Sequence, residues 1–189
     1  MPKFRIYPTL LNTFSYFLRG KITEQDLIDR INRVPTVATE AQQRGVSFEE
    51  ALIKGTNQDA FDPDILRKAR AKLPRPMVAT QAYCQYEIGD VTLYGFVDVL
   101  GQRAAVDIKT TANYQEGRFQ FDHQNFYLPA LQKRGIREMR YLITDFTDVY
   151  EEVYGLETDF QLQLDELYHF KTFLTEHQEQ ITDSKIMRI

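Results

Sequence analysis

The chain has 189 residues, of which 43% are hydrophobic, 13% aromatic and 26% charged, and its formal net charge at pH 7 is −4. This composition predicts one globular domain over residues 1–189 with a sizeable core. There is no run of 18 apolar residues and no basic start followed by an apolar stretch, so we expect a cytoplasmic protein without a membrane span or a secretory signal.

Cysteine content and charge narrow the function classes further. The single cysteine, Cys84, excludes an intramolecular disulfide and any cluster or zinc site held by several cysteines. The negative net charge argues mildly against a nucleic-acid partner, because phosphates favour basic surfaces. Acidic side chains that bind cations would, however, reverse the local sign.

The first third of the chain predicts a short extended segment followed by three helices. Residues 4–7 are extended, and Pro8 suits the first turn of a helix through about Leu18. Thr23 can cap a second helix to about Val34. A third helix over 37–54 is interrupted by Gly45, which costs about 1 kcal/mol relative to Ala; a close approach of another backbone or of nucleic acid would explain it.

Glu49 lies one helical turn after Gly45 and differs from its neighbour. Glu50 has an i,i+4 partner in Lys54, whereas Glu49 has none in its own helix. Either both glutamates are solvated surface residues, or Glu49 belongs to a functional site.

The middle of the chain predicts a helix over 63–73 and then three antiparallel strands at 77–88, 91–100 and 103–112. Because residues two apart share a face of a strand, Asp107 and Lys109 point one way while Val106 and Ile108 point the other. The same alternation in the preceding strand places Asp98 on the face of the sheet that carries Asp107.

The turn between the last two of these strands predicts their register. Gly101-Gln102 fits a two-residue loop, which places Asp98 opposite Ala105 and makes Asp107 its diagonal neighbour. Diagonal positions lie roughly 7–8 Å apart, so the two carboxylates can share one hard cation. On an exposed face the same residues would be a solvated acid and base. The apolar opposite face of both strands favours a central sheet.

The remaining residues predict a polar loop over 113–119, a helix from about 122 to 134, strands at 139–146 and 149–156, and a helix through Ile181 capped by Thr158 with Gln161. Arg118 is expected at the mouth of the cleft. On the 122–134 helix, either Gln124 or His123 can share a face with Tyr127. The element order predicts an α/β sandwich with a mixed central sheet flanked by helices.

Four segments in this order resemble the PD-(D/E)XK nuclease superfamily, in its RecB-type and phage-type (lambda exonuclease-like) branches. In chain order they are Arg44 to Glu49, Gly95-Phe96-Val97-Asp98, the run Asp107-Ile108-Lys109-Thr110-Thr111, and the helix with His123, Gln124 and Tyr127. Arg44, Gly45 and Glu49 match the phage-type Arg-Gly-x-x-x-Glu. The last helix departs from the RecB-type Gln-x-x-x-Tyr, because Gln124 and Tyr127 are three apart.

The resemblance implies a restriction-endonuclease-like core and a Mg²⁺-dependent deoxyribonuclease, most simply an exonuclease of phage-recombination or RecB-like type. It implies that Mg²⁺, or Mn²⁺ in its place, is held by Glu49, Asp98, Asp107 and the backbone carbonyl of Ile108, with no iron–sulfur cluster. Lys109 would act on water and phosphate.

The resemblance also implies accessory residues and partners. Gln124 or His123, with Tyr127, would position the nucleophile or a phosphate, and Arg44 and Arg118 are accessory candidates for contacts with nucleic acid. DNA is the expected partner, with a recombination or single-strand-binding protein as a second. Two alternatives stay open: a catalytically inactive nucleic-acid-binding module of the same fold, and a structural or interaction protein.

Overall fold

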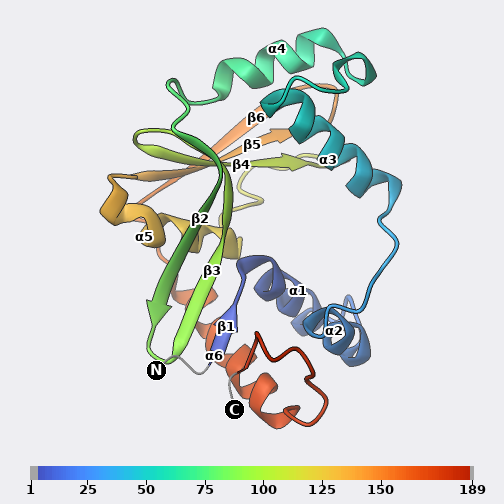
Figure 1. The fold of residues 1–189 in the computed structure, drawn as a ribbon, viewed down its shortest axis with the longest axis vertical. Helices are drawn as coiled ribbons and strands as arrows, with labels where there is room; N and C mark the ends of the chain where they lie inside the picture. The colour runs from blue at the N-terminus through green and yellow to red at the C-terminus, as the bar shows by residue number, and fades with distance from the viewer. Residues whose placement is uncertain (1–3, 188–189) are drawn as a thin grey trace.

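The computed structural model describes residues 4–187, and it confirms the predicted mixed α/β architecture. Among the described residues, six strands form one mixed sheet in the order β1-β3-β4-β5-β6, with β2 pairing β3, and helices lie against it (Figure 1). The strands are β1 (Phe4–Ile6), β2 (Ala79–Ile88), β3 (Val91–Leu100), β4 (Ala104–Thr110), β5 (Glu138–Thr144) and β6 (Val149–Gly155). The α-helices are α1 (Pro8–Leu18), α2 (Glu24–Ile31), α3 (Glu40–Ile53), α4 (Pro63–Lys72), α5 (Tyr127–Leu131) and α6 (Gln161–Glu176).

Strand β3 organises the sheet because three strands pair with it. The antiparallel partner β2 runs along one edge for its whole length. On the other edge, β1 pairs in parallel from Val91 to Leu93, and β4 pairs antiparallel only at Val99 and Leu100. Within the described residues, the stretch 94–98 of β3 therefore lies between two strands that diverge, and the sheet is forked there.

The same strand passes through three hydrophobic cores. Val91 and Leu93 pack with α1, α2 and α6, while Val97 packs with β2, β5 and α5. Val99 packs with α3 and α4. Figure 1 shows the corresponding arrangement, with α3 and α4 at one end of the molecule and α1, α2 and α6 at the other. Strand β3 thus contributes residues to all three cores and connects the helices at the two ends of the molecule.

Local capping explains where two of the helices begin. Thr23 forms a capping box with Asp26 at the start of α2, as predicted. Thr39 forms a second box with Gln42, so α3 begins at Glu40 rather than near Val37, which is 94% exposed.

Two predicted helices differ from expectation. The Thr158 cap is wrong: Phe160 occupies the N-cap position of α6, the Asp159 carboxylate accepts the Gln161 N–H at 2.9 Å, and the helix ends at Glu176. The helix expected over 122–134 is segmented into a 3-10 turn (His123–Phe126), α5 and a second 3-10 turn (Gln132–Arg134).

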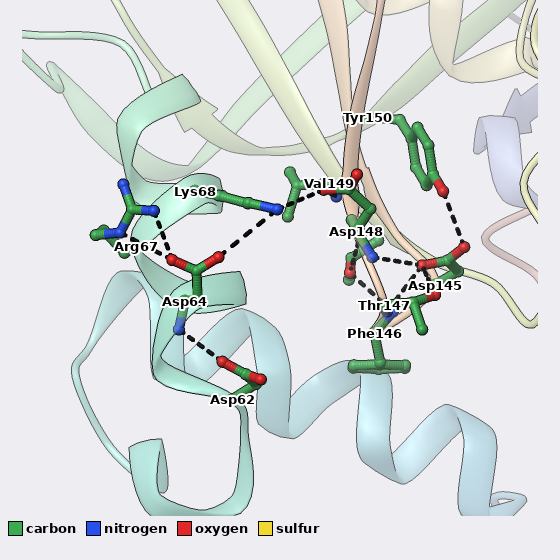
Figure 2. A network of polar contacts seen from close by, with 11 residues as sticks. Asp62, Asp64, Arg67, Lys68, Asp145, Phe146, Thr147, Asp148, Val149 and Tyr150 are labelled. Atoms are coloured by element: carbon green, nitrogen blue, oxygen red, sulfur yellow. Dashed lines mark hydrogen bonds and ion pairs between the residues drawn. The ribbon is translucent and has the colours of Figure 1, made fainter.

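A surface network ties α4 to the β5–β6 hairpin (Figure 2). Lys68 Nζ lies 3.0 Å from Asp148 Oδ1 and 3.6 Å from Asp64 Oδ2. Asp145 Oδ1 accepts hydrogen bonds from the N–H groups of Thr147 and Asp148, which shapes the hairpin turn. Exposed ion pairs of this kind contribute little to stability, so the network orients α4 more than it stabilises the fold.

No helix within residues 4–187 is both long enough and apolar enough to cross a membrane.

Candidate functional site

A polar pocket of about 680 Å³ lies at the fork, where β4 leaves β3 and α3 crosses above them. Its walls come from α1, α3, β3, β4 and the 3-10 turn that precedes α5. The lining residues are Thr9, Ala41, Gln42, Gly45, Val46, Glu49, Asp98, Asp107, Ile108, Lys109, Thr110 and Gln124. The structure therefore brings together the four residues that the sequence predicted to be catalytic.

The strand register differs from the prediction by two residues. Leu100 pairs with Ala105, and the Gly101 N–H donates to the Ala104 carbonyl at 2.8 Å, so the central turn residues are Gln102 and Arg103. In this register Asp98 aligns with Asp107 rather than with Ala105. The ladder stops before that pair, and Asp98 Oδ2 instead accepts a hydrogen bond from the Ile108 N–H at 2.7 Å.

Asp107, Lys109 and Gln124 form a closed triangle of contacts. Asp107 is 2% exposed, and its Oδ1 accepts a hydrogen bond from Gln124 Nε2 at 2.6 Å. Its Oδ2 lies 2.6 Å from Lys109 Nζ, which also donates to Gln124 Oε1. Burial raises the pKa of Asp107, and the Lys109 charge partly offsets this rise. Burial alone would lower the pKa of Lys109, but the neighbouring carboxylates raise it, so the ammonium stays charged.

Gln81, on β2, is a site residue that the sequence analysis missed. Its Nε2 donates to Glu49 Oε1 at 2.8 Å and to Asp98 Oδ1 at 3.1 Å, so one amide bridges two carboxylates. Gln81 has a φ of +48° inside a strand. Such a backbone conformation costs of order 1–3 kcal/mol in a residue other than glycine, and it is found more often at functional sites than elsewhere. Gln81 lies opposite Asp98, between the Thr80–Val99 and Ala82–Val97 pairs, and this strand register was the signal that could have pointed to it.

The carboxyl groups hold protons more tightly than usual. Burial raises the pKa of Asp98 to about 6, and the nearby Glu49 charge adds to the effect. Burial, together with the Asp107 charge, also raises the pKa of Glu49. A bound cation would relieve this repulsion between like charges.

The donor set fits a hard cation chemically. Carboxylate oxygens of Glu49, Asp98 and Asp107 face one pocket, and oxygen ligands suit Mg²⁺ and Mn²⁺. As they stand, no three His, Cys, Asp or Glu side chains within residues 4–187 converge closely enough to hold a metal. The Gln81 amide would compete with a cation for the two carboxylate oxygens that it bridges.

Two glycines explain how helices approach the strands. A Cβ at Gly45 would lie 2.9 Å from Thr110 Oγ1, so the glycine in α3 lets this helix lie close to β4. The close approach expected from the sequence is therefore to a side chain. A Cβ at Gly95 would overlap the ring of Tyr127, which packs directly on β3. Both glycines belong to the segments that the sequence analysis singled out.

Of the three residues proposed for the site from the 122–134 segment, only Gln124 lines the pocket, and Tyr127 packs against Gly95 beside it. The His123 side chain is fully buried on the opposite side, where Nδ1 lies 2.9 Å from Asn12 Oδ1 and Nε2 lies 3.2 Å from Glu166 Oε2. Burial lowers the pKa of His123 to about 4, so the imidazole is neutral at pH 7. Its surroundings are those of a structural residue between α1 and α6.

The two accessory arginines lie beside the pocket rather than in its wall. The Arg44 guanidinium stacks 3.7 Å above the Phe146 ring. Arg118 donates to Thr111 Oγ1 and, at 3.2 Å, to the Asn113 carbonyl, directly after the end of β4.

Comparison with known proteins supports the fold and no more. No family model and no curated protein sequence matches the chain. Among solved structures, the putative exonuclease of Eubacterium rectale is similar with a TM-score of 0.53 and 12% identity, over 96% of this chain and 82% of that one. SSO0001 is similar with a TM-score of 0.51 and 12% identity, over 92% and 78% of the two chains. The chain therefore shares its fold with a protein named as an exonuclease, at an identity that shows the fold alone.

Proposed function

We propose that this protein is a metal-dependent deoxyribonuclease of the PD-(D/E)XK type that hydrolyses phosphodiester bonds in DNA, most simply as an exonuclease of the phage-recombination or RecB-like kind. The observation that carries the proposal is the convergence of Glu49 from α3, Asp98 from β3, and Asp107 with Lys109 from β4 on one pocket. The fold shared with the Eubacterium rectale protein supports the same assignment.

In this proposal, Glu49, Asp98, Asp107 and the Ile108 carbonyl hold Mg²⁺ or Mn²⁺. When bound, such a cation lowers the pKa of a water molecule and offsets the charge of the reacting phosphate. The chain's own contribution is a preorganised ammonium group. Lys109 is held by Asp107 and Gln124, so its charge needs little reorganisation to act on a phosphate oxygen or on the attacking hydroxide.

Gln124 and Tyr127 act as positioning residues in this scheme. Gln124 contacts both Asp107 and Lys109, so it sets the distance between acid and amine. Tyr127 is buried between Gln124 and Gly95, and burial raises the pKa of its hydroxyl, which therefore stays protonated. Both residues lie on the 3-10 turn and helix that cover the fork.

Incubation with linear and circular DNA, in Mg²⁺ or in chelator, tests the proposal. Linear DNA should be degraded in Mg²⁺ and should survive in chelator, while a closed circle should resist an exonuclease. Glu49→Gln should abolish cleavage, whereas Glu50→Gln, the matched control, changes a neighbouring glutamate that is paired with Lys54 at 3.0 Å.

The outcomes separate the alternatives. Retained binding in a mobility-shift assay without any cleavage would favour an inactive nucleic-acid-binding module. Neither binding nor cleavage would favour a structural or interaction protein. Equal cleavage by Glu49→Gln and wild type would remove Glu49 from the ligand set.

A further inference from the structure

A second, smaller pocket of about 150 Å³ lies between α1 and the segment that leads into the 3-10 turn at His123. We call it the arginine pocket. It is lined by Asn12, Ser15, Tyr16, Arg19, Arg118, Phe119, Phe121 and Asp122.

The arginine pocket adjoins the carboxylate pocket through two pairs of neighbouring residues. Thr9 lines the carboxylate pocket and Asn12 lines the arginine pocket, one turn further along α1. Gln124 lines the first and Asp122 the second, and the Gln124 N–H donates to Asp122 Oδ1 at 2.8 Å. Asn12 Nδ2 donates to the same oxygen at 3.0 Å, which closes the wall between the pockets. The two pockets are therefore neighbours on either side of this wall.

Two arginines and one aspartate line this pocket, and Ser15 in its wall donates to the Glu166 carboxylate. Within residues 4–187, neither Arg19 nor Arg118 lies in an ion pair. The Asp122 carboxylate already accepts hydrogen bonds from Asn12 and Gln124. Arg118 is oriented by its bonds to Thr111 and Asn113. Two guanidinium groups in an acidic protein form a local site for an anion, and guanidinium geometry suits phosphate.

Exposed aromatic rings flank the same arginines. Tyr16 is 46% exposed and Phe121 is 48% exposed, although both belong to residue types that usually bury most of their surface. An aromatic platform beside a basic groove is the physical basis of single-strand binding, because every base offers a π-face for stacking. The residues that line the pocket thus combine both features.

We propose that the arginine pocket binds one nucleotide of a single-stranded DNA segment that leads to the carboxylate pocket. Arg19 and Arg118 contact its phosphate, and Phe121, with Tyr16, stacks on its base. Duplex DNA is disfavoured because its bases are paired and stacked on one another. This inference rests on the proposed nuclease function and adds the strand form of the substrate to it.

The absence of tryptophan from the sequence provides a direct probe. Phe121→Trp places a single indole on the proposed platform, and its fluorescence is titrated with the oligonucleotide (dT)8 in chelator, so that no cleavage occurs. We expect saturable quenching. Adding Arg19→Gln should weaken (dT)8 binding about tenfold. Arg67→Gln, the matched control, removes the same charge from α4, where Arg67 is paired with Asp64 (Figure 2), and should change affinity less than twofold.

Three results would overturn the inference: no quenching by (dT)8, unchanged affinity after Arg19→Gln, or equally tight binding of a blunt duplex. If Phe121→Trp does not fold, the anisotropy of labelled (dT)8 with wild type and with Arg19→Gln answers the same question. Because these titrations contain no free metal, their failure leaves the nuclease assay untouched. Conversely, quenching without Mg²⁺-dependent cleavage would refute only the proposed reaction.

Discussion

The Asp98 side chain takes the place of a backbone partner for Ile108. Its Oδ2 accepts a hydrogen bond from the Ile108 N–H at 2.7 Å, at the point where the β3–β4 ladder ends. We therefore expect different effects from two substitutions. Asp98→Asn keeps an acceptor oxygen and should not destabilise the fold, whereas Asp98→Ala leaves the N–H unpaired and should cost about 1–3 kcal/mol. Urea unfolding measures both. Equal losses in the two variants would show that this hydrogen bond contributes little.

Gln81 bridges Glu49 and Asp98 in the structure without a cation. Gln81→Ala removes hydrogen bonds to charged acceptors, so the metal-free protein should lose about 1–3 kcal/mol of stability. Mn²⁺ affinity should hold or improve, because the amide no longer competes for the two carboxylates. Chemical unfolding tests the loss of stability, and calorimetric titration tests the Mn²⁺ affinity. A large loss of Mn²⁺ affinity would instead make Gln81 part of the binding site.

Asp107 and Lys109 should fail in different ways, although they form one ion pair at 2.6 Å. Asp107→Asn should lose Mn²⁺ binding and cleavage together. Lys109→Ala should still bind Mn²⁺ but lose cleavage by roughly 10²–10³, the usual scale for one preorganised electrostatic group. Mn²⁺ titration beside a nuclease assay separates them. Equal loss of metal binding in both variants would point to a structural Asp107–Lys109 unit.

The raised pKa of Asp98 predicts a pH-dependent stability. Burial holds this pKa at about 6 in the folded protein, above the value of about 3.9 in an unfolded chain. Between these values the folded state binds more protons, so the contribution of Asp98 to stability falls as the pH rises. Relative to Asp98→Asn, the metal-free wild type should lose about 2 kcal/mol from pH 4 to pH 7.

Unfolding of both proteins in chelator, across that pH range, measures the difference. The stabilising effect of Mn²⁺ on wild type should grow over the same range, because protons and cation compete for the carboxylates. A difference that is independent of pH would mean that Asp98 titrates normally.

Gly95→Ala tests the contact between β3 and the helix above it. The added Cβ would lie within 2.9 Å of Tyr127 Cε1 and Cζ, in a fully packed region. Overpacking of this kind costs typically about 1–3 kcal/mol, and displacement of Tyr127 should also reduce cleavage through Gln124. Combining the change with Tyr127→Phe should relieve part of the cost, so the two effects should not add. Additive losses would contradict the contact.

The sequence by itself determined most of the helices and strands, and which face of the central strands carries the charged residues. Pro8 and Thr23 mark two helix starts, and strand alternation places Asp107 and Lys109 on one face, because both signals depend on residues a few positions apart. The i,i+4 pairing of Glu50 with Lys54 is likewise local, whereas the need for glycine at position 45 comes from Thr110 on β4.

Only the tertiary structure decided which side chains meet at the fork. His123 and Gln124 are adjacent in sequence, yet His123 packs against Asn12 and Glu166 while Gln124 reaches Asp107. The two-residue change of register and the bridging amide of Gln81 depend on how β2, β3 and β4 twist together. These choices follow from burial and hydrogen bonding between residues far apart in the chain, which no local pattern encodes.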